Sequence, residues 1–180
     1  LKASKDLLKI SKSFDLDFQD LNEFISLNEK RLLGLFSEEN NNFLSQDLKT
    51  NNNLNIPSIT NYFTLFADLN DDKINKKLIA NLKNHNSDEK YFFSSIDPKH
   101  ETFNEKRYWR GPVWINCNWL VYQGLKNKDK EYSNLLKKRT IDLIEEKGFH
   151  EYYSCINGNV MGANNFSWSA SLYLDLVLEN

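Results

Sequence analysis

Two aromatic segments contain the residues whose types and spacing could do chemistry. The first, at 107–125, reads RYWRGPVWINCNWLVYQGL and places three tryptophans and Arg110 around a Gly-Pro pair. The second, at 148–153, reads GFHEYY and holds one carboxylate, Glu151, among aromatic residues. Flat rings stack on the C–H faces of a sugar, while arginine and amide side chains bond its hydroxyls. Together with a sheltered acid, this pattern indicates a carbohydrate site with acid–base chemistry.

The residues of the first segment also have structural interpretations. Trp109 precedes a predicted helix and stands beside Arg110, which favours ligand stacking over packing. Trp119 fits a hydrophobic core, whereas Trp114 fits either a core or the rim of a site. Arg110 suits a structural ion pair as well as it suits substrate binding. The glycine at position 111 can be explained by the backbone alone, through a close approach of another segment or a special dihedral angle.

Glu151 alone would be an ordinary surface acid. Its neighbours Phe149, Tyr152 and Tyr153 favour a different reading, because removal from water would raise the pKa of its carboxyl group. The sequence shows no pair of histidines with zinc spacing, no glycine-rich phosphate loop and no nucleophile elbow. We therefore predict chemistry without a metal or an organic cofactor.

Composition excludes several classes of function. The net charge of −2 gives no basic field for nucleic acid or an anionic membrane, and no apolar run reaches the roughly 20 residues of a membrane span. Two cysteines, Cys117 and Cys155, form no disulfide framework, which favours a reducing, cytoplasmic setting. The chain begins with leucine and shows no signal peptide, so we expect a piece of a longer protein.

Apolar periodicity predicts helices along most of the chain. The expected helices cover about 17–37, 59–69, 71–84, 112–126, 130–147 and 166–178. Pro112 is expected in the first turn of its helix, and Gly148 at the end of another. Short extended pieces are expected near 43–50 and 91–96, within irregular connections.

The expected helices alternate between two burial patterns. Those at 112–126 and 166–178 are apolar on nearly every side, whereas those at 71–84 and 130–147 are amphipathic. Two concentric layers of helices explain this alternation, so we predict an all-α fold, the closing half of an (α/α)₆ toroid. Residues 1–180 would form part of one barrel domain, and by themselves would leave long apolar faces exposed.

In such a toroid the inner helices are parallel, and their N-terminal ends share one mouth. The polar and aromatic residues ahead of the inner helices should therefore meet at a concave rim. The residues expected there are Gln46, Asp47, Ser58, Tyr108, Trp109, Arg110, Gly111, Glu151, Tyr152, Tyr153, Asn164 and Asn165.

The two segments resemble the family 63 glycoside hydrolases and their bacterial and archaeal relatives. YWRGPVWINCNWLVYQGL resembles the hallmark segment of that family, and GFHEYYSCINGNVMGANNFSWSASLYLDLV resembles its closing segment. The segment LLGLFSEENNNFLSQDLKT is similar to the end of a family helix and its following loop. Two departures stand out: Ser154-Cys155 replaces an Asp-Pro pair, which we expect to loosen the loop that aims Glu151, and Phe36 stands where tryptophan is usual.

The resemblance implies an (α/α)₆ barrel and an inverting glycoside hydrolase that acts on an α-linked glucoside or mannoside. It assigns the general base to Glu151 and places the general acid, an aspartate, upstream of Leu1. Asp47 and Asp97 are weak substitutes for that acid, since Asp97-Pro98 has the sequence of a turn. The sugar-binding residues implied are Tyr108, Trp109, Arg110, Gly111, Trp114 and Asn165.

Three other functions fit parts of the pattern. A non-catalytic glycan-binding relative would keep the aromatic rim and lack the acid. A prenyl-processing toroid needs metal-binding acidic, cysteine or histidine motifs, and a scaffold for protein partners would carry its aromatics on an outer face. For the sugar site, an oligosaccharide, an α-glucan end or a sugar joined to glycerate all fit as the partner.

Overall fold

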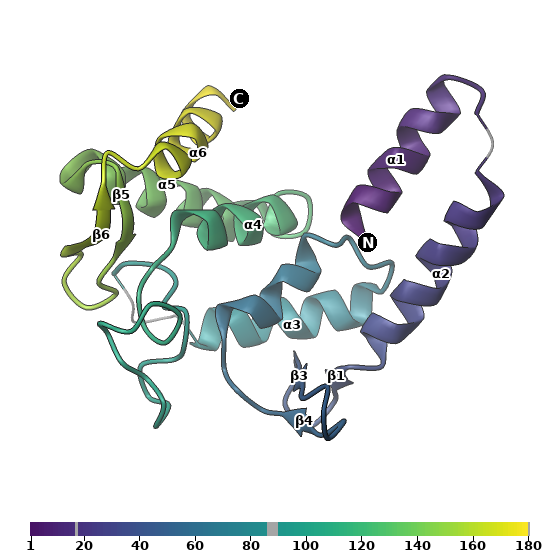
Figure 1. Cartoon of the computed structure of the whole chain (residues 1–180), viewed down its shortest axis with the longest axis horizontal. Coiled ribbons are helices and arrows are strands. Elements are labelled where there is room, and N and C mark those ends of the chain that lie inside the picture. The colour runs from purple at the N-terminus through teal and green to yellow at the C-terminus, as the bar shows by residue number, and fades with distance from the viewer. Residues whose placement is uncertain (17, 86–89, 180) are drawn as a thin grey trace.

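The chain is mostly helical, with three small two-stranded sheets (Figure 1). The computed structural model describes residues 1–16, 18–85 and 90–179. The helices are α1 (Lys2–Ser13), α2 (Gln19–Leu33), the 3₁₀ helix η1 (Ile59–Leu65), α3 (Asp72–His85), α4 (Ile115–Leu125), α5 (Lys130–Lys147) and α6 (Ser167–Leu178). The antiparallel sheets pair β1 (Phe36–Ser37) with β2 (Asn42–Phe43), β3 (Ser45–Gln46) with β4 (Asn53–Leu54), and β5 (His150–Tyr153) with β6 (Val160–Asn164).

Helix α4 lies at the centre and packs against η1, α5 and α6 (Figure 1). Val121 and Leu125 are fully buried, as expected for a helix that is apolar all round. At Gly124 an added Cβ would lie 2.6 Å from the backbone nitrogen of Phe66, so the glycine permits η1 to approach. Buried Asn118 is satisfied locally: its Oδ1 accepts from the backbone N–H of Phe93 at 2.8 Å.

Helix α5 follows its sequence signals closely. The side chain of Asp129 accepts a hydrogen bond from the backbone N–H of Tyr132 at 3.0 Å, which caps the N-terminus. Gly148 ends the helix with φ of +84°, a conformation that favours glycine. The prediction of an amphipathic helix over 130–147 is confirmed.

The predictions for the N-terminal half are partly wrong. One helix was expected over about 17–37, but α2 ends at Leu33, because Gly34 bonds back to Lys30 and the chain turns into β1; residue 17 lies outside the described residues. Two hairpins occupy 36–54, and the sequence signals did not indicate α1.

The prediction for Pro112, in the C-terminal half, is also wrong. Pro112 is not in the first turn of a helix, since α4 begins at Ile115 after an extended Trp114.

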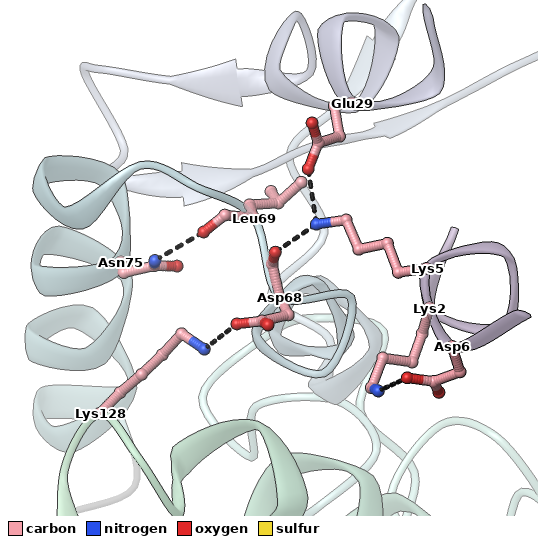
Figure 2. Close-up of polar contacts among 8 residues, drawn as sticks. All are labelled: Lys2, Lys5, Asp6, Glu29, Asp68, Leu69, Asn75 and Lys128. Carbon is pink, nitrogen blue, oxygen red and sulfur yellow. Dashed lines mark hydrogen bonds and ion pairs between the residues drawn. The ribbon is translucent and has the colours of Figure 1, made fainter. Parts of the chain in front are cut away.

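Helices α1 and α2 form a hairpin beside the rest of the chain (Figure 1). Figure 2 shows polar contacts that attach it. The ammonium group of Lys5 pairs with Glu29 at 2.5 Å and donates to the carbonyl oxygen of Asp68. Lys128 pairs with the Asp68 carboxylate at 2.8 Å, and this bond chiefly lowers the pKa of Asp68. Such partly exposed pairs add little stability each, so they fix geometry more than they drive folding.

Large apolar side chains remain exposed on α1, α2 and α6. Helix α6 is apolar on nearly every side, and one side stays uncovered, as expected for these residues by themselves: Leu174 is 54% exposed, and no described element covers it. The exposed apolar residues of the three helices are Leu7, Ile10, Phe24, Leu27, Trp168, Leu174, Val177 and Leu178. Among the described residues, no helix is long and apolar enough to cross a membrane.

We expect a chain of these 180 residues to self-associate, because clustered apolar surface favours contact with other copies. Light scattering coupled to gel filtration would measure this. Leu174→Lys should reduce the association, whereas Leu48→Lys, at an isolated exposed leucine in a turn, should leave it unchanged. A monodisperse monomer with a cooperative thermal melt would contradict the expectation.

Candidate active site

Backbone pairing brings the two aromatic segments together. Val113 and Tyr153 exchange two hydrogen bonds, of 2.8 and 3.0 Å, so the start of α4 lies against β5. The N–H of Phe166 donates to the carbonyl oxygen of Phe149 at 3.0 Å, which brings the start of α6 to the same place. The predicted convergence of the loops ahead of α4 and α6 is therefore present. The GFHEYY segment itself is a strand rather than the expected loop.

The aromatic side chains form one stacked cluster. The rings of Trp109 and Trp114 are stacked at 4.4 Å, and Trp114 stacks on Tyr152 at 4.9 Å. Tyr108 meets all three rings edge-on. Trp109 is 48% exposed and Trp114 only 3%, so Trp109 offers a free face while Trp114 supports it from below.

The carboxylate of Glu151 is held by two donors. Its Oε1 accepts from the Tyr108 hydroxyl at 2.5 Å, and its Oε2 accepts from the backbone N–H of Ala163 on β6 at 3.0 Å. The Tyr108 hydrogen bond, and then that of Ala163, lower the pKa of Glu151. The predicted rise in this pKa is therefore wrong, since the neighbouring rings leave the carboxylate open to water.

Glycines allow this arrangement at two points. Gly162 has φ of +72°, and an added Cβ would lie 2.5 Å from Oε2 of Glu151. At Gly111 a Cβ would lie 2.4 Å from the carbonyl oxygen of Asn104, so its role here is close approach of the backbone. Sequence reasoning noted a glycine-rich turn but missed Gly162 as a site residue. A glycine within β6, the strand that pairs with the strand of Glu151, was the feature that could have identified it.

Arg110 and Asn165 are both exposed, the first next to Trp109 in the chain and the second between β6 and α6. The Nε of Arg110 donates to the carbonyl oxygen of Thr102 at 2.9 Å. Among the described residues, its terminal amino groups do not form the ion pair that the sequence analysis considered. Asn165 has φ of +52° between β6 and α6, and its N–H donates to the Asn164 side chain at 2.8 Å. Both side chains are therefore available to a ligand.

The remaining rim candidates Gln46, Asp47 and Ser58, and the substitute acid Asp97, have local roles. Asp47 and Asp97 accept from the backbone N–H groups of Lys49 and Lys99, and so act as turn residues. Gln46 lines a separate hollow beside α2, and Ser58 caps η1 through the N–H of Thr60 at 3.3 Å. These side chains do not join Tyr108 and Glu151 in any contact that the described residues make.

Metal binding and thiol chemistry have little support within the described residues. No group of three histidine, cysteine or acidic residues could hold a metal ion there. Cys117 and Cys155 are buried and form no disulfide, and burial raises the pKa of Cys117 to about 12, so its thiolate is scarce.

Comparison of the sequence with known protein families identifies the class of protein to which this fold and site belong. Residues 1–169 match the family model described as the mannosylglycerate hydrolase MGH1-like glycoside hydrolase domain. The chain belongs to this family of glycoside hydrolases.

Curated relatives of this family match most of the chain. It is 32% identical to a mannosylglycerate hydrolase of Thermus thermophilus over 176 residues, which cover 96% of this chain and 42% of that protein. It is 31% identical to a mannosylglycerate hydrolase of Rubrobacter radiotolerans over 150 residues, covering 81% of this chain and 34% of the relative. The chain thus spans less than half the length of these relatives.

Solved structures agree on the fold. A crystal structure of family 63 mannosylglycerate hydrolase from Thermus thermophilus, in complex with glucose, matches with a TM-score of 0.91 and 29% identity, over 99% of this chain and 45% of that one. Neutral trehalase from Saccharomyces cerevisiae matches with a TM-score of 0.77 at 17% identity, which bears on the fold alone. The predicted part of an (α/α)₆ toroid is confirmed.

Tyr108→Phe should raise the pKa of Glu151, because the hydroxyl that favours its ionised form is removed. The lowered pKa means that this bond stabilises the fold above the ordinary carboxyl pKa, and that the effect fades as pH falls through the folded pKa. Carbon NMR of the Glu151 carboxyl group against pH would measure the shift. Tyr173→Phe, which removes a hydroxyl bonded to Glu145 instead, should not move it; equal pKa values in both variants would refute the assignment.

Gly162→Ala should displace the Glu151 carboxylate from its two donors and raise its pKa towards the ordinary value. Gly148→Ala is the matched control, because its φ is also positive but the nearest atoms to an added Cβ lie 3.9 Å away. Both variants should lose roughly 1–3 kcal/mol of unfolding free energy through backbone strain. The same NMR titration, paired with thermal melts, separates strain from displacement; no change of pKa in Gly162→Ala would exclude the clash.

Proposed function

We propose that the complete protein is an inverting glycoside hydrolase that acts on an α-linked glucoside or mannoside, with Glu151 as the general base. The observation that carries this proposal is the Glu151 carboxylate, held by Tyr108 and Ala163, where the ring of Tyr108 also contacts the half-exposed Trp109. Family membership supports the class of reaction.

Glu151 has the capacity to take a proton from water. An ionised carboxylate offers about four lone-pair sites, and the Tyr108 and Ala163 donors occupy two of them. A water molecule can therefore hydrogen-bond to either oxygen without displacing these donors. The lowered pKa keeps the group unprotonated at neutral pH, which a general base requires.

The aromatic cluster provides the sugar subsite of the proposal. The free face of Trp109 would stack on a pyranose ring, while Arg110 and Asn165 would bond its hydroxyls. Tyr108 would orient both the base and the sugar, and Gly111 and Trp114 would hold the loop and the stack in place. No metal or organic cofactor is needed for this chemistry.

A glycoside of glycerate is the substrate that we favour. Relatives are named mannosylglycerate hydrolase, and one from Mycolicibacterium hassiacum, 32% identical over 82 residues, is named glucosylglycerate hydrolase. The terminal amino groups of Arg110 form a planar fork that suits the carboxylate of such an aglycone.

Inversion requires a second carboxyl group, about 6.5–9.5 Å from the base, to protonate the leaving oxygen. Asp47 and Asp97, the two substitutes considered from the sequence, instead accept hydrogen bonds from backbone N–H groups in turns. We propose that this acid belongs to the part of the protein outside the 180 residues. Its contribution would complete the mouth of the toroid on the side opposite to Glu151.

Glu151→Gln in the complete protein should reduce turnover about 10²–10⁴-fold and preserve substrate binding, because the amide cannot accept the proton. Mannosylglycerate, glucosylglycerate and α-linked disaccharides would be screened, and proton NMR would identify the anomer first released. Glu101→Gln, at an exposed carboxylate outside the two aromatic segments, should be neutral. Near-normal turnover in Glu151→Gln would remove Glu151 from the mechanism. Sugar binding without turnover in the parent protein would favour the glycan-binding alternative.

A further inference from the structure

A partly buried contact joins the loop that carries Tyr108 to the segment that follows strand β5. The Ser154 hydroxyl donates to Oε1 of Glu105 and accepts from the backbone N–H groups of Ile156 and Asn157, at 3.1 and 3.3 Å. One donor and two acceptor positions are all that a hydroxyl has, so its bonding capacity is filled. Ser154 is only 1% exposed, which shields these bonds from water.

The contact also corrects an expectation from sequence. The Ser154-Cys155 pair was expected to loosen the loop that aims Glu151. Instead, the N–H of Ser154 donates to the carbonyl oxygen of Asn159 at 2.8 Å, and the N–H of Gly158 donates back to Ser154 at 3.0 Å. The turn between β5 and β6 is therefore tied down by both the backbone and the side chain of Ser154.

On the other side of the contact, Glu105 belongs to a loop that is closed on itself. The N–H of Asn104 donates to the carbonyl oxygen of Arg110 at 2.8 Å, and the N–H of Arg107 donates to that of Asn104 at 3.0 Å. Gly111 packs on the Asn104 carbonyl with no space for a side chain. Because the loop is closed in this way, a shift at Glu105 would be transmitted to Tyr108.

We propose that Glu105, through Ser154, is a positioning residue that sets the place of Tyr108 and Trp109 relative to Glu151. This rests on the proposed function. The bond between Tyr108 and Glu151 is exposed, and in the reaction it shares the carboxylate with water. The contact of Glu105 with Ser154 lies outside that chemistry, so it can maintain the spacing of loop and strand throughout a turnover.

Four substitutions in the Glu105–Ser154 pair separate the hydrogen bond from the charge and from the side-chain length. Glu105→Ala removes the acceptor, whereas Glu105→Gln keeps a carbonyl oxygen that accepts from Ser154 without the charge. Glu105→Asp keeps the charge but shortens the reach by one methylene group. Ser154→Ala removes the donor and also frees the N–H groups of Ile156 and Asn157.

In the complete protein, Glu105→Ala should lower kcat about tenfold or more, with a smaller effect on KM, because small misplacement of a catalytic group is costly. The acid limb of kcat/KM should move to higher pH. The titratable group that contacts Glu151 is Tyr108 from the loop, and a looser Tyr108 no longer favours the ionised carboxylate. Glu105→Gln should restore both quantities.

A purely structural role would lower the melting temperature and leave kcat of the folded enzyme and the acid limb unchanged. That outcome in Glu105→Ala, or equal damage in Glu105→Gln, would overturn the proposal. If Glu105→Ala does not fold, Glu105→Asp gives the same comparison with a shorter side chain.

The Glu151 pKa, measured by NMR, separates this proposal from the proposed function, because it needs no turnover. If the Glu151→Gln variant remained active, the proposed hydrolase mechanism would be wrong. The effect of the Glu105 variants on the Glu151 pKa would still test the positioning role. Inactive Glu151→Gln together with an unchanged pKa and kcat in Glu105→Ala would defeat only the positioning role.

Discussion

The site depends on the pair of backbone hydrogen bonds between Val113 and Tyr153. They join the segment that leads into α4 to the strand that carries Glu151, although the two are 40 positions apart in sequence. With that register fixed, Tyr108 can reach the carboxylate and Trp114 can stack on Tyr152. The strand is irregular between His150 and Tyr152, and this irregularity lets the neighbouring side chains of Glu151 and Tyr152 both contact Tyr108.

The direction of the pKa shift of Glu151 is set by its two hydrogen-bond donors rather than by burial of the carboxyl group. A carboxyl group among rings would be expected to lose contact with water and become harder to ionise. Here the rings of Tyr108, Trp114 and Tyr152 pack against one another and leave the carboxylate at their edge. Two hydrogen bonds then favour the charged form. The arrangement suits a base that must be ready to accept, and it places the orienting hydroxyl where a sugar would also bind.

Much of the fold was predictable because its signals are local. The amphipathic period of α5, the aspartate at its N-terminus and the glycine at its end all lie within one stretch of chain. The uniform apolarity of α4 correctly predicted a central, buried helix, and the exposed side of α6 agrees with the expectation that these residues by themselves leave apolar faces uncovered. The hairpins over 36–54 were missed because their short pairings depend on partners that apolar periodicity does not reveal.

For the site, the sequence alone determined the residue types: one acid among aromatic residues, a tryptophan beside an arginine, and a family resemblance that covers both segments. Only the tertiary structure decided how they meet. It set the direction of the Glu151 pKa shift, the need for glycine at 162 and the contact of Glu105 with Ser154. Each of these depends on atoms brought within a few ångströms by backbone pairing across distant parts of the chain, and residue order does not encode such distances directly.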